Sequence, residues 1–132
     1  MARIALIGSS GMLGYDLLRT AREGDTVVGL THEEVEIADA ERVRAALTAV
    51  RPDVVINTAA FTKTEACESD PLLAFQVNAI GAYYVARAAK ELGAAVLYVS
   101  TDFVFDGSKN AFTEADSPNP LNVYGASKFA GE

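Results

Sequence analysis

The feature that most constrains the fold is a glycine-rich turn close to the N-terminus. Gly8, Gly11 and Gly14 recur at every third position, between the apolar run Arg3–Ile7 and a helical segment expected at residues 12–23. Glycine here permits a tight turn, close approach of a pyrophosphate to the backbone, and close packing of helix on strand. The helix start then offers free N–H groups and partial positive charge. We therefore predict a dinucleotide-binding strand–turn–helix unit in preference to an ordinary βα turn that happens to use three glycines.

Short apolar runs alternate with helical segments along the rest of the chain. The expected strands lie at residues 3–7, 26–30, 54–56 and 96–99. They are short and apolar without alternation, as in strands that are buried on both faces. A longer loop is expected from about residue 102 to 122, and a last helix from residue 122 or 123. This order predicts an α/β fold, a Rossmann-type doubly wound parallel sheet with helices on both faces.

Capping residues mark the ends of the expected helices. Asp39 is a good N-cap for a helix that runs to about residue 50, and Gly24 is expected to end the helix of residues 12–23. Asp70 followed by Pro71 is a strong start signal. We expect the helix that begins there to run without interruption to about residue 92, with Gly93 as its stop.

Composition narrows the class of protein. The chain has 132 residues, half of them apolar, which suits one globular domain. Its net charge of −7 disfavours a polyanionic partner, so we expect no nucleic acid partner. No apolar run approaches the roughly 20 residues of a membrane span, and the first strand begins too early to leave room for a signal peptide.

The single cysteine indicates a reducing compartment. Cys67 cannot form an internal disulfide, which fits a cytoplasmic protein. A catalytic thiol is disfavoured, because the neighbouring Glu65 and Glu68 would oppose formation of a thiolate.

Two segments carry candidate catalytic groups. Tyr124 and Lys128 are four residues apart, so a helix would place them on one face, about 5–6 Å apart at Cβ. A nearby ammonium lowers the pKa of a tyrosine from its usual value of about 10, which makes it a better proton donor and acceptor at neutral pH. Ser100, Thr101 and Asp102 follow the fourth expected strand, at the sheet edge where open α/β folds bind ligands. A hydroxyl there can hold a carbonyl oxygen for reduction.

The tip of the second expected strand leaves the cofactor open between NADH and NADPH. An acidic residue there binds the ribose hydroxyls of NAD, whereas arginine accommodates the 2′-phosphate of NADP. This chain has Thr31 and His32 at the tip, and Glu33 and Glu34 follow as expected solvated loop charges.

Together these motifs resemble the extended short-chain dehydrogenase/reductase family, specifically its dTDP-4-dehydrorhamnose reductases. The resemblance covers the whole chain. Its most specific stretches are residues 57–62 (Asn-Thr-Ala-Ala-Phe-Thr), 77–79 (Val-Asn-Ala), 100–107 (Ser-Thr-Asp-Phe-Val-Phe-Asp-Gly) and 120–125 (Pro-Leu-Asn-Val-Tyr-Gly). Phe61 stands where the family often has tyrosine.

The resemblance implies a role for each matching residue. The residues implied to bind the cofactor are Gly8, Gly11, Met12, Leu13, Gly14, Ala59, Ala60, Phe61, Tyr124 and Lys128. Thr101 matches the family's catalytic hydroxyl, and Ser100 would be the last residue of the strand. Tyr124 would donate a proton to the C4 oxygen of the substrate. Lys128 would bind the nicotinamide ribose and lower the pKa of the tyrosine. No metal is implied.

The implied reaction is reduction of dTDP-4-keto-6-deoxy-L-mannose to dTDP-L-rhamnose, with NADPH or NADH as cofactor and a sugar nucleotide as partner. Residues 1–132 would form the cofactor-binding domain and lack the C-terminal substrate-binding portion, so we expect cofactor binding and negligible turnover from this chain alone. A homodimer is compatible with the resemblance. Two alternatives share these motifs: a regulatory NADP-binding subunit like the β subunit of methionine adenosyltransferase, and another extended sugar-nucleotide epimerase or reductase. A purely structural module would leave the motifs as coincidence.

Overall fold

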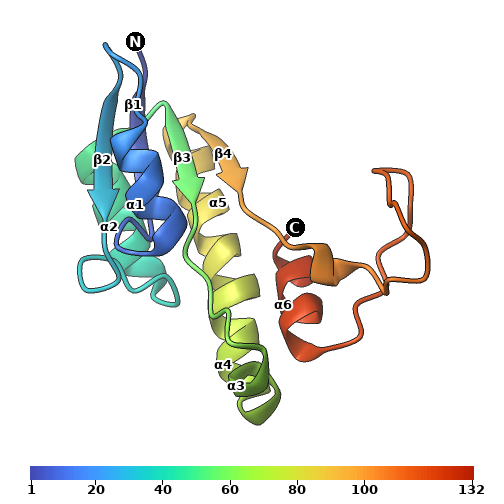
Figure 1. The fold of residues 1–132 in the computed structure, drawn as a ribbon. Coiled ribbons are helices and arrows are strands. Elements are labelled where there is room, and N and C mark those ends of the chain that lie inside the picture. Colours follow the sequence, from blue (N-terminus) through green and yellow to red (C-terminus); the bar gives the residue numbers. More distant parts are fainter.

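A four-stranded parallel sheet forms the centre of the molecule in the computed structural model, which describes all residues 1–132 (Figure 1). The strands are β1 (Arg3–Ile7), β2 (Thr26–Leu30), β3 (Val54–Asn57) and β4 (Ala95–Tyr98), in the order β2-β1-β3-β4. Ile7 at the end of β1 pairs with Leu30 of β2 and with Asn57 of β3, so these strands end at a common edge. The predicted α/β fold is therefore confirmed.

Helices cover both faces of this sheet. The helices of the chain are α1 (Met12–Arg19), α2 (Ala40–Val50), α3 (Thr64–Ser69), α4 (Pro71–Phe75), the π-helix η1 (Gln76–Gly81), α5 (Ala82–Leu92), the 3₁₀ helix η2 (Asp102–Val104) and α6 (Val123–Gly131). Figure 1 shows α1 in front of the sheet and both α2 and α5 behind it. Because β2 and β3 lie on opposite sides of β1, the chain reverses its winding between β1 and β3, and the crevice at such a point is where open α/β sheets bind ligands.

The hydrophobic core lies between the sheet and the α2–α5 pair. Its fully buried members include Val43 and Leu47 of α2, Val85 of α5, and Ile7 and Val55 of the strands. Burying a side chain of this size contributes about 1.5–3 kcal/mol each relative to solvent exposure. The core therefore fixes the strands from behind and leaves their carboxyl ends free to carry the site.

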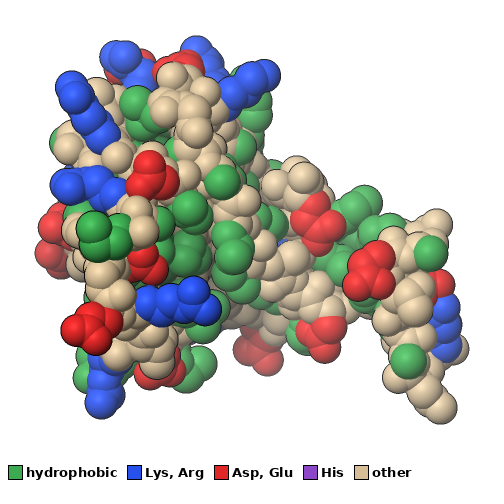
Figure 2. Space-filling view, turned by 90° about the horizontal axis from the view of Figure 1, so that it is seen from above, with side chains coloured by type: hydrophobic (Ala, Val, Ile, Leu, Met, Phe, Trp, Pro, Cys, Tyr) green, Lys and Arg blue, Asp and Glu red, His purple; other side chains and the backbone are tan.

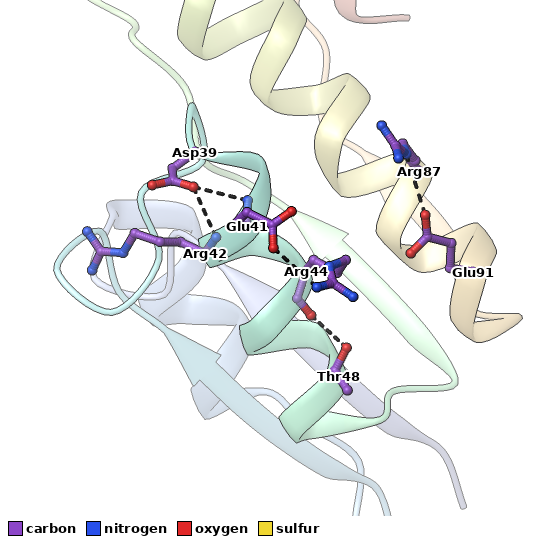
Figure 3. Close-up of polar contacts among 7 residues, drawn as sticks. All are labelled: Asp39, Glu41, Arg42, Arg44, Thr48, Arg87 and Glu91. Atoms are coloured by element: carbon purple, nitrogen blue, oxygen red, sulfur yellow. Dashed lines mark hydrogen bonds and ion pairs between the residues drawn. The ribbon is translucent and has the colours of Figure 1, made fainter.

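The N-cap predicted for α2 is confirmed. A carboxylate oxygen of Asp39 accepts hydrogen bonds from the N–H groups of Glu41 (3.0 Å) and Arg42 (3.1 Å) (Figure 3). Figure 3 also shows the ion pair between Arg44 and Glu41 (3.1 Å). On α5 a second exposed pair, Arg87 with Glu91, spans 3.4 Å (Figure 3). Such exposed pairs contribute little stability, so the cap is the stronger determinant of where α2 begins.

Helix α1 ends earlier than the sequence predicted, at Arg19 and not at residue 23. The hydroxyl of Thr20 donates to the carbonyl of Asp16 (3.0 Å) and lies 3.4 Å from that of Leu17. This side chain takes up the carbonyl groups of the last turn and so competes with continuation of the helix.

The expected single helix of residues 71–92 is divided, which corrects a second prediction. Asp70 caps α4 as predicted, by accepting from the N–H of Leu73 (3.0 Å). However, the chain passes through the π-helix η1 before α5 begins, and the preceding α3 was not predicted at all. A π-helical turn holds one extra residue and occurs where tertiary contacts outweigh regular helix geometry.

Strand β4 ends at Tyr98, so the predictions that it reaches Val99 and that Ser100 is its last residue are wrong. The N–H of Val99 still donates to Asn57 of β3, at 3.3 Å, but its carbonyl accepts from the Lys128 side chain. The backbone therefore leaves the sheet to meet α6.

Residues 105–121 form a lobe that projects from the side of the sheet (Figures 1 and 2). Phe105 and Phe112 stack within it, with ring centroids 4.5 Å apart, and Lys109 pairs with Asp116. None of the helices has both the length and the apolar character needed to cross a membrane.

Candidate active site

The glycine loop forms a cradle of backbone N–H groups at the carboxyl end of β1. Gly8 adopts a φ of +84°, in the region that favours glycine, and its N–H donates to the Leu30 carbonyl of β2 (2.9 Å). Helix α1 begins at Met12 with Gly11 as an N-cap that has no side-chain hydrogen bond. The N–H groups of the first helical turn have no acceptor within the helix, so they are available to an anion.

Close backbone contacts explain why the loop needs glycine at two positions. A Cβ atom on Gly14 would lie 2.3 Å from the carbonyl oxygen of Gly8, because α1 presses directly against the turn. A Cβ atom on Gly8 would lie 2.7 Å from Oγ1 of Thr58 and 2.8 Å from the nitrogen of Ala59. The cradle is therefore shaped by the absence of side chains, and it fits the pyrophosphate of a dinucleotide.

The end of β3 is tied to the end of β1 beside this cradle. Thr58 donates its hydroxyl to the carbonyl of Ile7 (2.8 Å), and the buried Asn57 accepts from the N–H of Ala59 (3.1 Å). These two bonds fix the segment that continues into Ala60 and Phe61. The residues expected under the adenosine side of the cofactor thus lie next to the glycine loop.

Two cavities meet over this loop. The first, of about 520 Å³, is mainly apolar, and its wall includes Val35, Ile37 and Phe61. The second, of about 320 Å³, is lined by Met12, Leu13, Gly14, Thr62, Val99, Ser100, Tyr124 and Lys128. Gly11, Thr58 and Ala60 belong to both walls. Because they share these residues, the two cavities form one groove across the carboxyl ends of the strands.

The tip of β2 contributes His32 and Glu36 to the first cavity. Nε2 of His32 lies 3.4 Å from a carboxylate oxygen of Glu36. Glu34, in contrast, accepts from the backbone N–H (2.7 Å) and the hydroxyl (2.9 Å) of Thr31, and these hydrogen bonds lower the pKa of its carboxyl group. Of the acidic residues that follow β2, Glu36 is therefore the one that lines the first cavity, and the sequence analysis did not identify it.

Tyr124 and Lys128 occupy one side of the second cavity, where helix α6 passes over the end of the sheet. The predicted spacing on a helix is confirmed, and Asn122 begins that helix by accepting from the N–H of Gly125 (2.7 Å). The ring of Phe103 contacts the Tyr124 ring edge-on, with centroids 5.6 Å apart. Both Tyr124 and Lys128 line the same cavity as the first turn of α1.

The Lys128 side chain is almost completely buried, with 2% of its surface exposed. Its ammonium group donates to the carbonyl oxygen of Val99 (2.6 Å) and lies 4.1 Å above the centre of the Tyr98 ring. Burial lowers the pKa of Lys128 to about 8, while the charge of Glu132 acts in the opposite direction. A lysine whose pKa is lowered this far toward neutral pH is typical of functional sites.

The hydroxyl groups of Ser100 and Thr101, which follow β4, differ in their position relative to the second cavity. Ser100 lines the cavity that contains Tyr124, and its hydroxyl is hydrogen-bonded to the carboxylate of Glu132. Thr101 is next to this cavity but does not line it. Its hydroxyl accepts from the N–H of Phe103 (3.2 Å) and lies 3.4 Å from a carboxylate oxygen of Asp102.

Asn78 is a site residue to which sequence reasoning assigned no role. It is buried in η1, and its side-chain amide accepts from the N–H of Phe61 (2.8 Å) and donates to the carbonyl of the same residue (3.0 Å). It also donates to the hydroxyl of Ser127 on α6 (2.9 Å). One buried amide thus joins Phe61, in the wall of the first cavity, to the helix that carries Tyr124. The available signal was an asparagine inside an otherwise apolar helical segment.

Cys67 lies apart from this chemistry. It is buried in α3, and its thiol donates weakly to the carbonyl of Phe61 (3.4 Å). Burial, followed by the charge of Glu68, raises the pKa of the thiol. The expectation of an unreactive cysteine is consistent with this direction.

Comparison with known proteins gives one consistent family. The family model described as the RmlD substrate binding domain matches residues 2–132. The spore coat polysaccharide biosynthesis protein SpsK of Bacillus subtilis is 38% identical over 134 residues, covering 100% of this chain and 47% of SpsK. A dTDP-4-dehydrorhamnose reductase of Streptomyces griseus is 42% identical over 132 residues, covering 98% of this chain and 43% of that protein.

A solved structure agrees with these relatives. The crystal structure of dTDP-4-dehydrorhamnose reductase from Bacillus anthracis in complex with NADP superimposes with a TM-score of 0.96 at 36% identity, covering 98% of this chain and 47% of that one. The chain thus spans less than half the length of these relatives. Because the family model matches almost every residue, the chain belongs to the RmlD substrate binding domain family.

Proposed function

We propose that this chain binds NADH or NADPH and supplies the proton-donating half of a carbonyl reductase. The pyrophosphate would lie against Gly8, Gly11 and Gly14, with backbone N–H groups of Met12 and Leu13 as donors. The adenosine ribose would lie over residues 59–61, in the larger cavity. The nicotinamide end would then reach the smaller cavity, beside Tyr124 and Lys128.

The chemistry follows from the side chains of the smaller cavity. The bound cofactor supplies a hydride to the carbonyl carbon. Tyr124 donates its phenolic proton to the carbonyl oxygen, so that the ketone becomes an alcohol and the tyrosine becomes a phenolate. The ammonium of Lys128 stabilises this phenolate, and solvent then restores the proton. Thr101 is assigned to hold the carbonyl oxygen through its hydroxyl.

The observation that carries this proposal is the continuity of the groove. An amide-lined phosphate cradle and a Tyr–Lys pair lie in the wall of the same cavity, although they are more than 100 residues apart in sequence. The substrate that we propose is dTDP-4-dehydrorhamnose, because several relatives are named reductases of this compound. Residues beyond this chain would supply most of the contacts to that sugar nucleotide.

Titration of the purified chain with NADH and with NADPH tests the cofactor half of the proposal. Binding would enhance the fluorescence of the reduced nicotinamide and shift its emission. We expect saturable binding of at least one cofactor, and the ratio of the two dissociation constants gives the preference. Failure of both cofactors to bind a folded chain would refute the proposal.

A Tyr124→Phe variant of the full-length protein tests the catalytic half. It should bind the cofactor as tightly as the wild type and lose about 100-fold or more in kcat, as expected for removal of a general acid. Tyr83→Phe is the matched control, since Tyr83 is an exposed residue of α5 whose hydroxyl has no hydrogen-bond partner in the structure. Equal rates for Tyr124→Phe and the wild type would remove the assigned role.

The compartment and the assembly are further parts of the proposal. A free, buried Cys67 supports a protein of the reducing cytoplasm. Light scattering of the full-length protein tests the proposed homodimer, and a mass equal to one chain would contradict it.

A further inference from the structure

The buried ammonium of Lys128 is held without a carboxylate partner. The ion pairs of the chain join other residues, and none includes Lys128. Its single hydrogen-bond acceptor in the protein is the carbonyl of Val99, and the face of the Tyr98 ring lies beneath it at 4.1 Å. A cation this close to the centre of an aromatic ring is attracted by the electron-rich face of the ring, and more strongly when water is excluded.

The hydroxyl of the same tyrosine fixes the backbone of Lys128. Tyr98 shares its hydroxyl proton between the carbonyl oxygen of Asn78 (3.1 Å) and that of Lys128 (3.3 Å). Burial raises the pKa of Tyr98 to about 12, so the hydroxyl remains a donor throughout the neutral range. One side chain of β4 therefore contacts both ends of the lysine, the ammonium through its ring and the carbonyl through its hydroxyl.

The packing around Tyr98 leaves little freedom for other arrangements. A Cβ atom on Gly131 of α6 would lie 2.5 Å from the Tyr98 hydroxyl oxygen and 2.4 Å from the Asn78 carbonyl oxygen. Helix α6 thus passes directly over the tyrosine, and only glycine fits at the crossing. The contact between β4 and α6 fixes where the lysine can sit relative to the groove.

Few other charges act on this lysine. Directly after α6 the carboxylate of Glu132 raises its pKa, and the phenols of Tyr98 and Tyr124 face the same region. Helices α4 and η1 carry no titratable side chain. The titratable residues of α3 and η2, which form no ion pair with Lys128, are Glu65, Cys67, Glu68 and Asp102.

We propose that Tyr98 is a positioning residue for Lys128: its ring stabilises the charged ammonium at the groove, and its hydroxyl fixes the helix that carries the lysine. Tyr98 does not line the groove, so it acts through Lys128 and not on a ligand. The consequence for catalysis rests on the function proposed above. The contact itself does not, because it can be measured without cofactor or substrate.

The test is an NMR titration of the lysine side chains in the folded chain. Only four lysines are present, and Lys128→Met assigns the signal of interest. The wild type should show a midpoint near pH 8 for Lys128. Tyr98→Phe keeps the ring and should leave this midpoint almost unchanged. Tyr98→Leu removes the ring and should lower it by roughly one pH unit.

Two further variants make the result decisive. Tyr84→Leu, at a half-buried tyrosine that packs against the core, is the matched control and should not move the Lys128 midpoint. If Tyr98→Leu does not fold, pentafluorophenylalanine at position 98 keeps the shape of the ring and reverses its electrostatics, and it should lower the midpoint relative to Tyr98→Phe. An unchanged midpoint in a folded ring-deficient or fluorinated variant would overturn the inference. If the wild type bound neither NADH nor NADPH, that result would count against the proposed function and not against the role of Tyr98.

Discussion

The free energy of unfolding should depend on pH through Lys128, and replacing this lysine by a neutral side chain should remove that dependence. Replacing it by methionine keeps the length of the side chain and deletes the ammonium group. In the unfolded chain the lysine has its ordinary pKa of 10.5, whereas burial lowers its pKa to about 8 in the folded chain. Below pH 8 the lysine is protonated in both states, so the folded chain bears the full cost of burying the charge.

The sign and size of the effect follow from these two values. Between pH 8 and 10.5 the unfolded chain binds more protons at this residue than the folded chain, so the free energy of unfolding rises with pH. Each pKa unit of difference corresponds to about 1.4 kcal/mol. The wild type should therefore gain about 3 kcal/mol relative to Lys128→Met between pH 7 and 10.5.

Urea unfolding of both proteins, followed by circular dichroism at several pH values, measures this difference. Ionisation of other groups affects the two proteins equally and cancels. Lys90→Met is the matched control, because Lys90 is an exposed residue near the end of α5, and its difference from the wild type should stay constant with pH. A Lys128→Met difference that is equally constant would refute the reasoning that the ammonium is buried at a cost.

Three further predictions concern the site. Gly14→Ala should cost about 1–3 kcal/mol in urea unfolding and weaken NADH or NADPH in the titration, because its Cβ atom would lie 2.3 Å from a carbonyl oxygen; unchanged affinity would contradict the cradle. Asn78→Ala should destabilise the chain by about 2–4 kcal/mol, clearly more than Ser127→Ala, since it leaves the N–H of Phe61 without a partner and the carbonyl of Phe61 with only the weak thiol donor of Cys67. In the full-length protein, Thr101→Val should lower kcat by about 100-fold and Ser100→Ala far less, because the Ser100 hydroxyl is already bonded to a carboxylate; the reverse order of rates would assign the role to Ser100.

Much of the fold could be predicted because the deciding signals are local. The glycine loop, the unbroken apolar runs and the caps Asp39 and Asp70 each depend on a few neighbouring residues, and all were found where expected except for the bounds of β4. The spacing of Tyr124 and Lys128 was likewise readable once α6 was recognised.

The features that were missed depend on contacts between distant segments. Strand β4 ends early because the carbonyl of Val99 binds Lys128, which lies 29 residues further along the chain. The π-helix holds Asn78 against Phe61 and Ser127, and an asparagine inside an apolar helical segment does not by itself show which distant groups it binds. The early end of α1 is an exception, since Thr20 bonds to carbonyls only three and four residues away. The prediction that Gly24 ends this helix did not take the nearer Thr20 into account.

The π-helix η1 has a consequence for how the chain tolerates insertions and deletions. Each residue of an α-helix advances the rotation about its axis by about 100°, and a π turn accommodates one surplus residue. Removing a single residue between positions 76 and 81 would let the whole stretch close as a regular α-helix. If the same stretch instead became regular α-helix with all its residues kept, the surplus residue would rotate Asn78 relative to Val85 by about 100°, so that the apolar face of α5 could meet the sheet, or the amide could meet α6, but not both. The irregular turn thus sets the angular phase between the core and the groove.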